Sequence, residues 1–346
     1  MLLGNVARTT VVVVIAVCVC LDAGDTVAQP AGGAPRGRAA PQSGGAHRGH
    51  LAAPLPHRPA ARPSSTPHPV VSPSVVHGAG ANIDVNLSSN LAAAMTTLHL
   101  RTVRDAHDDP DLASHLEQME AAGIQPLIVM YGCSVSDAHR LADNRFLLQR
   151  VHRIFGDASI WWELGNENDI QCGLTARQYT AMWNGEIPAL RNIYPHDWFG
   201  GPVTFQANPS FIAYFVAHAS PGPDFISWHE YTCSSADSAR TCIDNVARWP
   251  AHIATTRQRI SAEGLSAPPV FITEWNYAPD GGVASDGKHG NATFMNQWTT
   301  MALRTLAEND VAESYQFDTS GVLPLVDSRG TATAQGVAFS GFWGSR

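Results

Sequence analysis

The chain has 346 residues, of which 15% are charged, and it contains 29 glycines and 23 prolines. This length suits one barrel-sized domain with accessory segments. From residue 74 to the end there are 16 basic and 28 acidic residues, a net charge of −12 by subtraction, which argues against a nucleic-acid-binding domain. We therefore expect no nucleic-acid partner.

Residues 1–28 have the features of a signal peptide. Arg8 supplies the positive charge, residues 11–21 form an apolar segment of 11 residues, and Thr26-Val27-Ala28 is a small-residue cleavage site. A membrane-spanning helix needs about 20 apolar residues, and Asp22 and Asp25 end this run too early. We predict a secreted, periplasmic or cell-envelope protein, with no membrane span in the mature chain.

Residues 29–73 are predicted to form a disordered linker rich in proline, alanine and arginine. They hold ten prolines and five arginines but no aspartate or glutamate. Such a segment buries too little apolar surface to offset the entropy lost on ordering. Two roles fit this composition, namely loose association with an acidic envelope polymer and a simple spacer.

Residues 74–346 alternate strand and helix signals. A helix is expected to begin at Asp109-Pro110, with Asp109 as its N-cap, and to end at Gly123. Eight strands separated by helical segments predict a (β/α)₈ TIM barrel. A doubly wound open sheet is the alternative, but no glycine-rich phosphate turn follows the first strand. The predicted strands are residues 75–76, 98–105, 124–131, 159–167, 199–204, 225–231, 270–274 and 313–317.

Two of these strands end in a glutamate. The fourth carries Trp162-Glu163-Leu164-Gly165-Asn166-Glu167, and the seventh carries Thr273-Glu274-Trp275-Asn276. The C-terminal ends of barrel strands meet at one face, where the active sites of this fold lie. The sequence therefore predicts one site that contains both Glu167 and Glu274.

These two motifs look like the fourth- and seventh-strand motifs of the retaining glycoside hydrolases of clan A. They resemble in particular the β-xylosidase/α-L-iduronidase family and the α-L-arabinofuranosidase family. The resemblance implies an exported retaining glycosidase that cleaves O-glycosidic bonds of an oligo- or polysaccharide by double displacement. It implies that Glu167 is the general acid/base, that Glu274 is the nucleophile, and that no cofactor takes part.

The same resemblance implies roles for residues around the two glutamates. Asn166 would hydrogen-bond the 2-hydroxyl of the sugar. His229 and Tyr231 lie on the same side of the sixth strand, and in such enzymes a tyrosine there holds the nucleophile. A basic residue at the end of the second strand does likewise, and Arg104 fits this position, with Arg101 as the alternate.

Three further residues near the motifs have competing interpretations. Trp275, and less securely Trp162, would stack on a sugar face, whereas packing is the alternative and is favoured for Trp162. Glu163 precedes Glu167 by four residues, which corresponds to roughly 13 Å along an extended strand. We therefore expect Glu163 to be a buried structural acid paired with an arginine.

Asp105, Asp108, Asp109 and Asp111 would suit calcium, but helix capping explains at least Asp109. No histidine-rich metal signature is present, so we predict no metal. A metal-dependent barrel hydrolase is therefore disfavoured. The remaining alternative is a glycan-binding TIM-barrel protein of the cell envelope that does not turn its ligand over.

Four cysteines follow the signal segment and allow three pairings. Cys133 follows the third strand and Cys172 the fourth, so their loops are expected to be neighbours. Cys233 and Cys242 bracket one loop after the sixth strand. We predict the disulfides Cys133–Cys172 and Cys233–Cys242.

Overall fold

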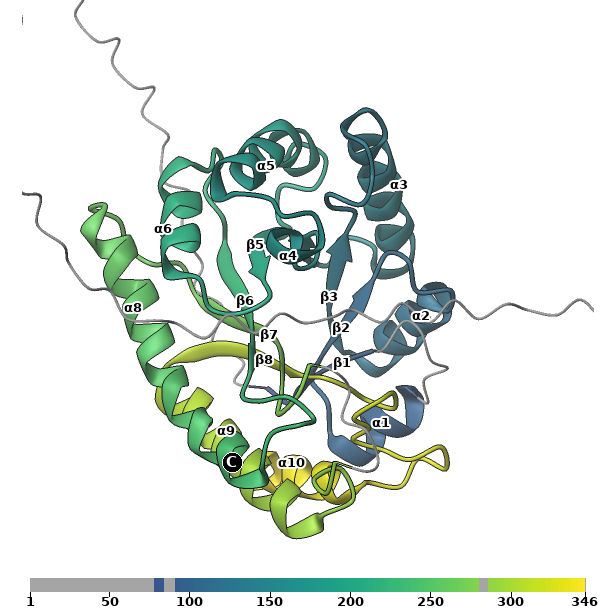
Figure 1. Ribbon diagram of the computed structural model, residues 1–346. Helices are drawn as coiled ribbons and strands as arrows, with labels where there is room; N and C mark the ends of the chain where they lie inside the picture. Colours follow the sequence, from purple (N-terminus) through teal and green to yellow (C-terminus); the bar gives the residue numbers. More distant parts are fainter. Residues whose placement is uncertain (1–77, 84–90, 280–285, 346) are drawn as a thin grey trace, which may run out of the picture. The chain divides into compact units, whose positions relative to one another are not determined.

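The computed structural model describes residues 78–83, 91–279 and 286–345. Eight parallel strands form a closed barrel in the order of the sequence, and the helices lie around it (Figure 1). The predicted (β/α)₈ fold is therefore confirmed. The signal peptide, the linker and the first predicted strand lie outside the described residues. Within the described residues, no helix is long and apolar enough to cross a membrane.

The strands of the barrel are short, between three and seven residues each. They are β1 (Gly80–Asn82), β2 (Thr102–Ala106), β3 (Gln125–Met130), β4 (Trp161–Leu164), β5 (Trp198–Thr204), β6 (Phe225–Tyr231), β7 (Val270–Asn276) and β8 (Val311–Gln316).

The connecting segments are mainly helical. The helices are α1 (Leu91–Leu98), α2 (Leu112–Ala122), α3 (Asp137–Phe155), α4 (Asn168–Gln171), α5 (Ala176–Arg191), α6 (Pro209–His218), α7 (Ala239–Asn245), the 3₁₀-helix η1 (Val246–Arg248), α8 (Trp249–Ala262), α9 (Ala292–Glu308) and α10 (Ala334–Gly344).

An apolar layer closes the inside of the barrel. Trp161 of β4 and Phe271 of β7 have ring centroids 5.3 Å apart, and because these strands are not neighbours, the contact crosses the barrel interior. The cluster comprises Leu127, Trp161, Phe225, Phe271 and Tyr315. Glu163 of β4, His229 of β6 and Glu274 of β7 follow the cluster residues along their strands, so they lie closer to the C-terminal face.

The first strand differs from the prediction. β1 is the segment Gly80–Asn82, not the valine pair at 75–76. Its residues are small and none is β-branched, so the local sequence carries no strand signal. A Cβ atom at Gly80 would lie 2.4 Å from the backbone oxygen of Ser314 and 2.7 Å from Oγ1 of Thr102. Tertiary packing therefore selects this segment, because only glycine fits between β2 and β8.

The helix predicted to begin at Asp109 begins at Leu112, with Asp111 as its N-cap. The Asp109 N-cap prediction is wrong. Asp109 instead accepts a hydrogen bond through Oδ1 from the backbone N–H of Asp111 at 2.7 Å. The predicted end is confirmed, because Gly123 has the left-handed conformation with φ of +65°.

The fourth strand ends earlier than predicted, at Leu164. Gly165 follows with φ of +75°, and a Cβ atom there would lie 2.4 Å from Nδ2 of Asn168. Glu167 also has a left-handed backbone, with φ of +44°, and its N–H donates to the carbonyl oxygen of Val203 at 2.9 Å. Glu167 therefore lies in a tight turn that leads into α4, and not on the strand.

Candidate active site

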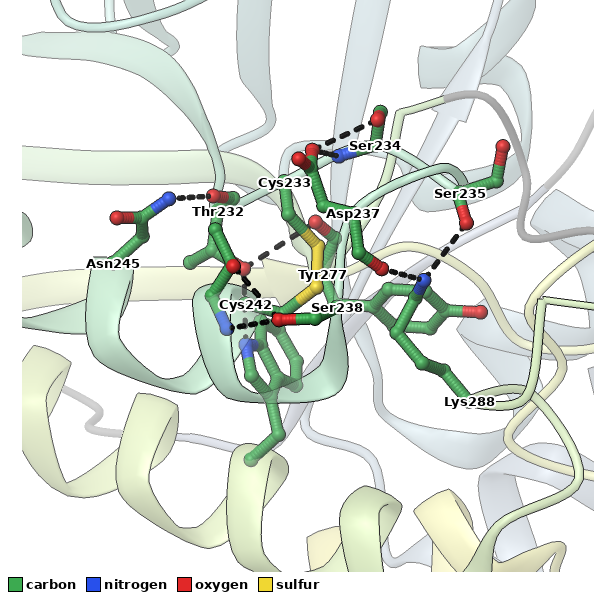
Figure 2. Close-up of a disulfide and its surroundings, with 12 residues drawn as sticks. Thr232, Cys233, Ser234, Ser235, Asp237, Ser238, Cys242, Asn245, Tyr277 and Lys288 are labelled. Carbon is green, nitrogen blue, oxygen red and sulfur yellow. Dashed lines mark hydrogen bonds between the residues drawn. A yellow bond between two sulfur atoms is a disulfide. The ribbon is translucent and has the colours of Figure 1, made fainter.

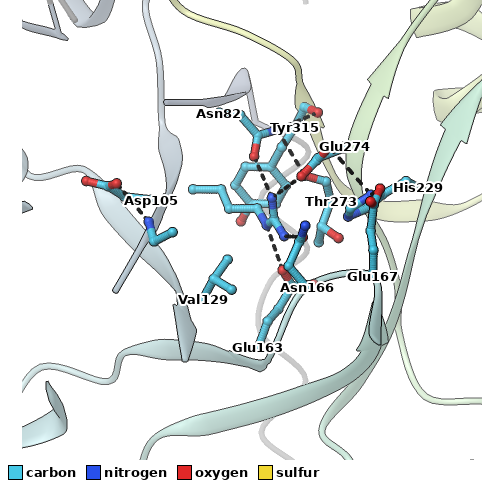
Figure 3. Close-up of polar contacts among 12 residues, drawn as sticks. Asn82, Asp105, Val129, Glu163, Asn166, Glu167, His229, Thr273, Glu274 and Tyr315 are labelled. Atoms are coloured by element: carbon cyan, nitrogen blue, oxygen red, sulfur yellow. Dashed lines mark hydrogen bonds and ion pairs between the residues drawn. The ribbon is translucent and has the colours of Figure 1, made fainter. Parts of the chain in front are cut away.

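The two glutamates singled out in the sequence lie together at the C-terminal ends of the strands. An oxygen of the Glu167 carboxyl group, an oxygen of the Glu274 carboxyl group and a ring nitrogen of His229 all lie within 4.8 Å of one another. Figure 3 shows the two carboxyl groups beside His229, with β7 contributing Glu274 and the turn after β4 contributing Glu167.

Glu274 is held from several sides. Arg104 donates from Nη1 to Oε1 at 2.6 Å, and Tyr231 donates its hydroxyl to Oε2 at 2.8 Å. His229 Nδ1 lies 3.5 Å from Oε2. The residue is only 9% exposed. Both carboxyl oxygens therefore have a donor, which fixes the position of the group and favours its ionised form.

Arg104 connects four side chains around the barrel mouth. Besides Glu274, it donates from Nε to Glu163 Oε2 at 2.6 Å, from Nη2 to Asn166 Oδ1 at 2.6 Å and from Nη1 to Asn82 Oδ1 at 2.9 Å (Figure 3). The guanidinium plane is thereby determined by residues from β1, β2, the end of β4 and β7. Arg101, the alternate candidate, is exposed.

Glu167 is held by a histidine side chain. His229 Nδ1 lies 2.8 Å from Glu167 Oε1, while the glutamate side chain keeps 15% of its surface exposed. His229 itself is fully buried. Glu167 is thus held less tightly than Glu274 and keeps access to the space above the barrel mouth.

The surroundings shift the pKa values of the two carboxyl groups in opposite directions. Burial raises the pKa of Glu167, the hydrogen bond and charge of His229 offset part of this, and the negative charge of Glu274 raises it further. Burial would also raise the pKa of Glu274, but the positive charges of His229 and Arg104, followed by the Tyr231 hydrogen bond, lower it below the ordinary value. One group is therefore suited to carry a proton and the other to stay ionised.

The pKa values of the two groups that face Glu274, His229 and Tyr231, are also shifted by its charge. Burial lowers the pKa of His229, but the charge of Glu274 and the contact with Glu167 outweigh this and raise it overall. Burial and the negative charge of Glu274 raise the pKa of the Tyr231 phenol well above its ordinary range. Tyr231 therefore stays protonated and remains a hydrogen-bond donor.

Glu163 is a buried acid paired with an arginine, as predicted, and it has no exposed surface. The predicted depth is wrong. Glu163 shares Arg104 with Glu274 and Asn166 and therefore lies close beneath them, because the chain turns after Leu164 instead of continuing as an extended strand. Asn82 was missed, since its strand gives no sequence signal.

Trp275 does not face the barrel mouth. It is fully buried, and its ring centroid lies 6.4 Å from that of Trp249 and 5.9 Å from that of Trp298 in α9. Successive strand residues point to opposite faces, so Trp275 points to the helices when Glu274 points inward. The sugar-stacking prediction for Trp275 is wrong. Trp162 is also fully buried, and its Nε1 donates to Asp197 Oδ2 at 2.7 Å.

Both predicted disulfides are confirmed. Cys133 pairs with Cys172, which joins the loop after β3 to the end of α4, and Cys233 pairs with Cys242. Lys288, a residue only 1% exposed, donates from Nζ to the backbone oxygens of Ser235 at 2.8 Å and Asp237 at 2.6 Å (Figure 2). The loop after β6 is therefore fastened both by a disulfide and by a side chain from the segment that follows β7.

Two groups among the described residues bring three metal-ligating side chains together. One is the Glu167, His229 and Glu274 cluster, and the other is Asp105, Asp109 and His115. In the second group His115 Nδ1 lies 3.1 Å from Asp105 Oδ2 and 3.2 Å from Asp109 Oδ2. A histidine between two carboxylates explains this second group as a buried ion pair.

No family model matches the chain, and no curated protein matches it in sequence. Solved structures are similar to it in fold. A glucosidase from Croceicoccus marinus aligns over 76% of this chain and 66% of its own, at 15% identity and a TM-score of 0.55. A monomeric β-xylosidase from Caulobacter crescentus aligns over 75% and 66%, at 17% identity and a TM-score of 0.57.

A family 51 α-L-arabinofuranosidase from Bifidobacterium longum aligns over 77% of this chain and 72% of its own, at 11% identity and a TM-score of 0.58. The chain covers slightly less than two thirds of the glucosidase and the β-xylosidase. At these identities the likeness concerns the fold. The predicted resemblance to clan A barrels is confirmed at that level.

Proposed function

We propose that this chain is an exported, retaining glycoside hydrolase that cleaves O-glycosidic bonds of an oligo- or polysaccharide. The observation that carries the proposal is a pair of carboxyl groups with one oxygen of each within 4.8 Å of the other, the first group held ionised by Arg104 and Tyr231 and the second raised in pKa beside His229. Retaining glycosidases require two carboxyl groups about 5–5.5 Å apart with these opposite protonation states. The glycosidase neighbours in fold are consistent with a carbohydrate substrate.

In the first step, an oxygen of Glu274 attacks the anomeric carbon. The bond between that carbon and the leaving oxygen breaks, and Glu167 transfers its proton to the leaving oxygen. His229, 2.8 Å from Glu167, then stabilises the carboxylate that this transfer leaves behind. The product of the step is a glycosyl ester of Glu274.

In the second step, the ionised Glu167 takes a proton from water while the water oxygen attacks the anomeric carbon. The bond from that carbon to Glu274 breaks, and both glutamates return to their starting protonation states. Arg104 and Tyr231 bind the carboxylate that is released. Two inversions at one carbon give net retention of configuration.

Asn166 is the candidate for binding the substrate beside the reacting carbon. Its Oδ1 accepts from Arg104 Nη2 at 2.6 Å, which fixes the orientation of the amide and directs the donor group Nδ2 away from Arg104. A hydrogen bond from Nδ2 to the 2-hydroxyl of the sugar would stabilise the transition state.

Export is consistent with two disulfides, which persist in oxidising compartments.

A panel of polysaccharides and chromogenic glycosides tests this proposal. We expect wild-type protein to release reducing sugar from at least one member and Glu274→Ala to release none. Binding without release in the wild-type protein would instead support a non-catalytic glycan-binding barrel. Activity that survives in Glu274→Ala, or is lost with a chelator, would contradict the assigned mechanism.

A further inference from the structure

Glu163 is connected to the candidate nucleophile Glu274 through Arg104 and is itself shielded from solvent. It is fully buried on β4, and its Oε2 accepts from Arg104 Nε at 2.6 Å. Arg104 Nη1 contacts Glu274 Oε1 at the same distance. One guanidinium group therefore serves two carboxyl groups, of which only Glu274 takes part in the proposed reaction (Figure 3).

The Glu163–Arg104 pair is poorly explained by stability alone. Removing a carboxylate from water costs several kcal/mol, and a buried ion pair often returns no more than that. Among the described residues, Glu163 Oε1 has no hydrogen-bond partner, although it is buried. Arg104 already donates to Asn82, Asn166 and Glu274. The guanidinium group would thus keep three partners without Glu163.

The contact with Nε has a geometric consequence. Nε lies in the guanidinium plane and is held rigidly relative to both terminal nitrogens, so a hydrogen bond at Nε fixes the directions of Nη1 and Nη2 together. With Glu163 in place, Nη1 points to Glu274 and Nη2 to Asn166. A substrate-binding amide and a nucleophile are therefore aligned by one buried carboxylate.

The charge of Glu163 has a second consequence. Arg104, Glu163 and Glu274 together carry a net charge of −1 when both acids are ionised, whereas Arg104 and Glu274 alone would be neutral. Glu163 therefore offsets part of the positive charge that Arg104 presents to Glu274. The Glu274 carboxylate is then more basic than it would be in a simple ion pair with Arg104. A more basic carboxylate is a better nucleophile toward the anomeric carbon.

We propose that Glu163 is a positioning residue that acts on Glu274 through Arg104. It fixes the guanidinium plane and offsets part of the positive charge that Arg104 presents to Glu274. This inference rests on the proposed glycosidase function, since it assigns Glu163 a role in that site. It predicts that Glu163 affects the ionisation of Glu274 without touching the substrate.

Two variants separate charge from contact. Glu163→Gln keeps an acceptor for Arg104 Nε and removes the charge. We expect the acid limb of the kcat/KM profile, which reports Glu274 in the free enzyme, to move down by about one pH unit, with turnover reduced about 10-fold. Glu163→Asp keeps the charge and withdraws the contact, so turnover falls while the acid limb stays in place.

Glu186 provides the matched control. It is also a buried glutamate whose Oε1 accepts from an arginine Nε, that of Arg140, and its Oε2 accepts from Asn144 Nδ2 at 2.9 Å. It lies on α5, away from the candidate site. Glu186→Gln should lower the melting temperature and leave the pH profile unchanged. If Glu163→Gln behaves the same way, Glu163 is purely structural and the inference is wrong.

A titration that needs no catalysis separates this inference from the proposed function. With ¹³C-labelled glutamate carboxyl groups, the Glu274 resonance is assigned by its loss in Glu274→Gln, and its pKa is followed in wild type and in Glu163→Gln. A fall of about one unit supports the inference, and an unchanged value overturns it. If wild type hydrolyses no glycoside, the proposed function fails while this result stands. Should Glu163→Gln not fold, Glu163→Asp carries the test, and unchanged turnover there also overturns the inference.

Discussion

The end of β7, which carries Glu274, and the turn after β4, which carries Glu167, are built differently. Glu274 lies on β7 and accepts hydrogen bonds on both oxygens, from Arg104 and Tyr231. Glu167 lies beyond the end of β4 in a left-handed turn, and its side chain contacts His229. A nucleophile must stay ionised and in place, whereas a proton donor must exchange its proton. The difference in support matches the difference in the proposed roles.

The largest expected effect follows from removing the tightly held group. Glu274→Ala leaves no carboxylate to attack the anomeric carbon, so we expect a loss of about 10⁴-fold or more on all substrates, including those with activated leaving groups. Sodium azide, as an external nucleophile, should restore turnover with an activated substrate and give the glycosyl azide of inverted configuration. Azide product of retained configuration would contradict the nucleophile assignment.

The loosely held group should respond differently. Glu167→Ala removes the proton donor and should slow turnover by around 10²–10⁴-fold, and by least for substrates whose leaving group needs no proton. Initial rates on a series of aryl glycosides of increasing leaving-group pKa provide the measurement. An equal loss across the series would mean that Glu167 does not donate the proton.

How far the sequence predicts this site depends on how far each strand continues regularly. His229 and Tyr231 lie two residues apart on β6, and both reach the glutamates, because alternation holds along that strand. The same rule, applied to Glu274 and Trp275, would have placed the tryptophan outside the barrel. The stacking prediction therefore ignored information that the sequence contained.

Other features could not be predicted from the sequence. The turn at Gly165 and Glu167 depends on a hydrogen bond to Val203, a residue of a different strand. β1 has no strand signal of its own and forms because only Gly80 fits between its neighbours. Asn82, which helps to hold Arg104, was hidden for the same reason. Long-range packing overrides local propensity at these positions.

His229 contacts both glutamates, so its removal should change the pKa values of both. Its positive charge lowers the pKa of Glu274, and its hydrogen bond lowers that of Glu167. In His229→Gln both limbs of the kcat/KM profile should therefore move to higher pH, by about one unit. His252, which contacts Glu230 Oε1 at 3.0 Å away from the glutamate pair, offers the control variant His252→Gln. Limbs that do not move in His229→Gln would show that His229 does not couple the two groups.

The smallest effect concerns a buried acid–histidine contact outside the site. Burial raises the pKa of Asp105 from 3.8 to about 6, and contact with Asp105 outweighs burial to raise that of His115. Both folded pKa values lie above the unfolded ones. The stability that these groups contribute is therefore complete at low pH and is lost as pH rises through the folded values.

Urea unfolding at pH 5 and pH 8 measures this effect. We expect wild type to lose about 1–3 kcal/mol more than Asp105→Asn over this interval. Glycosidase turnover should change little, because Asp105 does not contact the two glutamates. An equal loss in both proteins would mean that Asp105 is not the titrating group.

The configuration of the first-formed product tests the central claim most directly. Carboxyl oxygens within 4.8 Å match the short separation of retaining glycosidases and not the wider one of inverting enzymes, so the proposal has Glu274 attack the sugar itself. Proton NMR of a reaction with a substrate of known anomeric configuration, recorded before mutarotation, should show the anomer of the substrate as the first product. The opposite anomer would mean direct attack by water and would contradict the account.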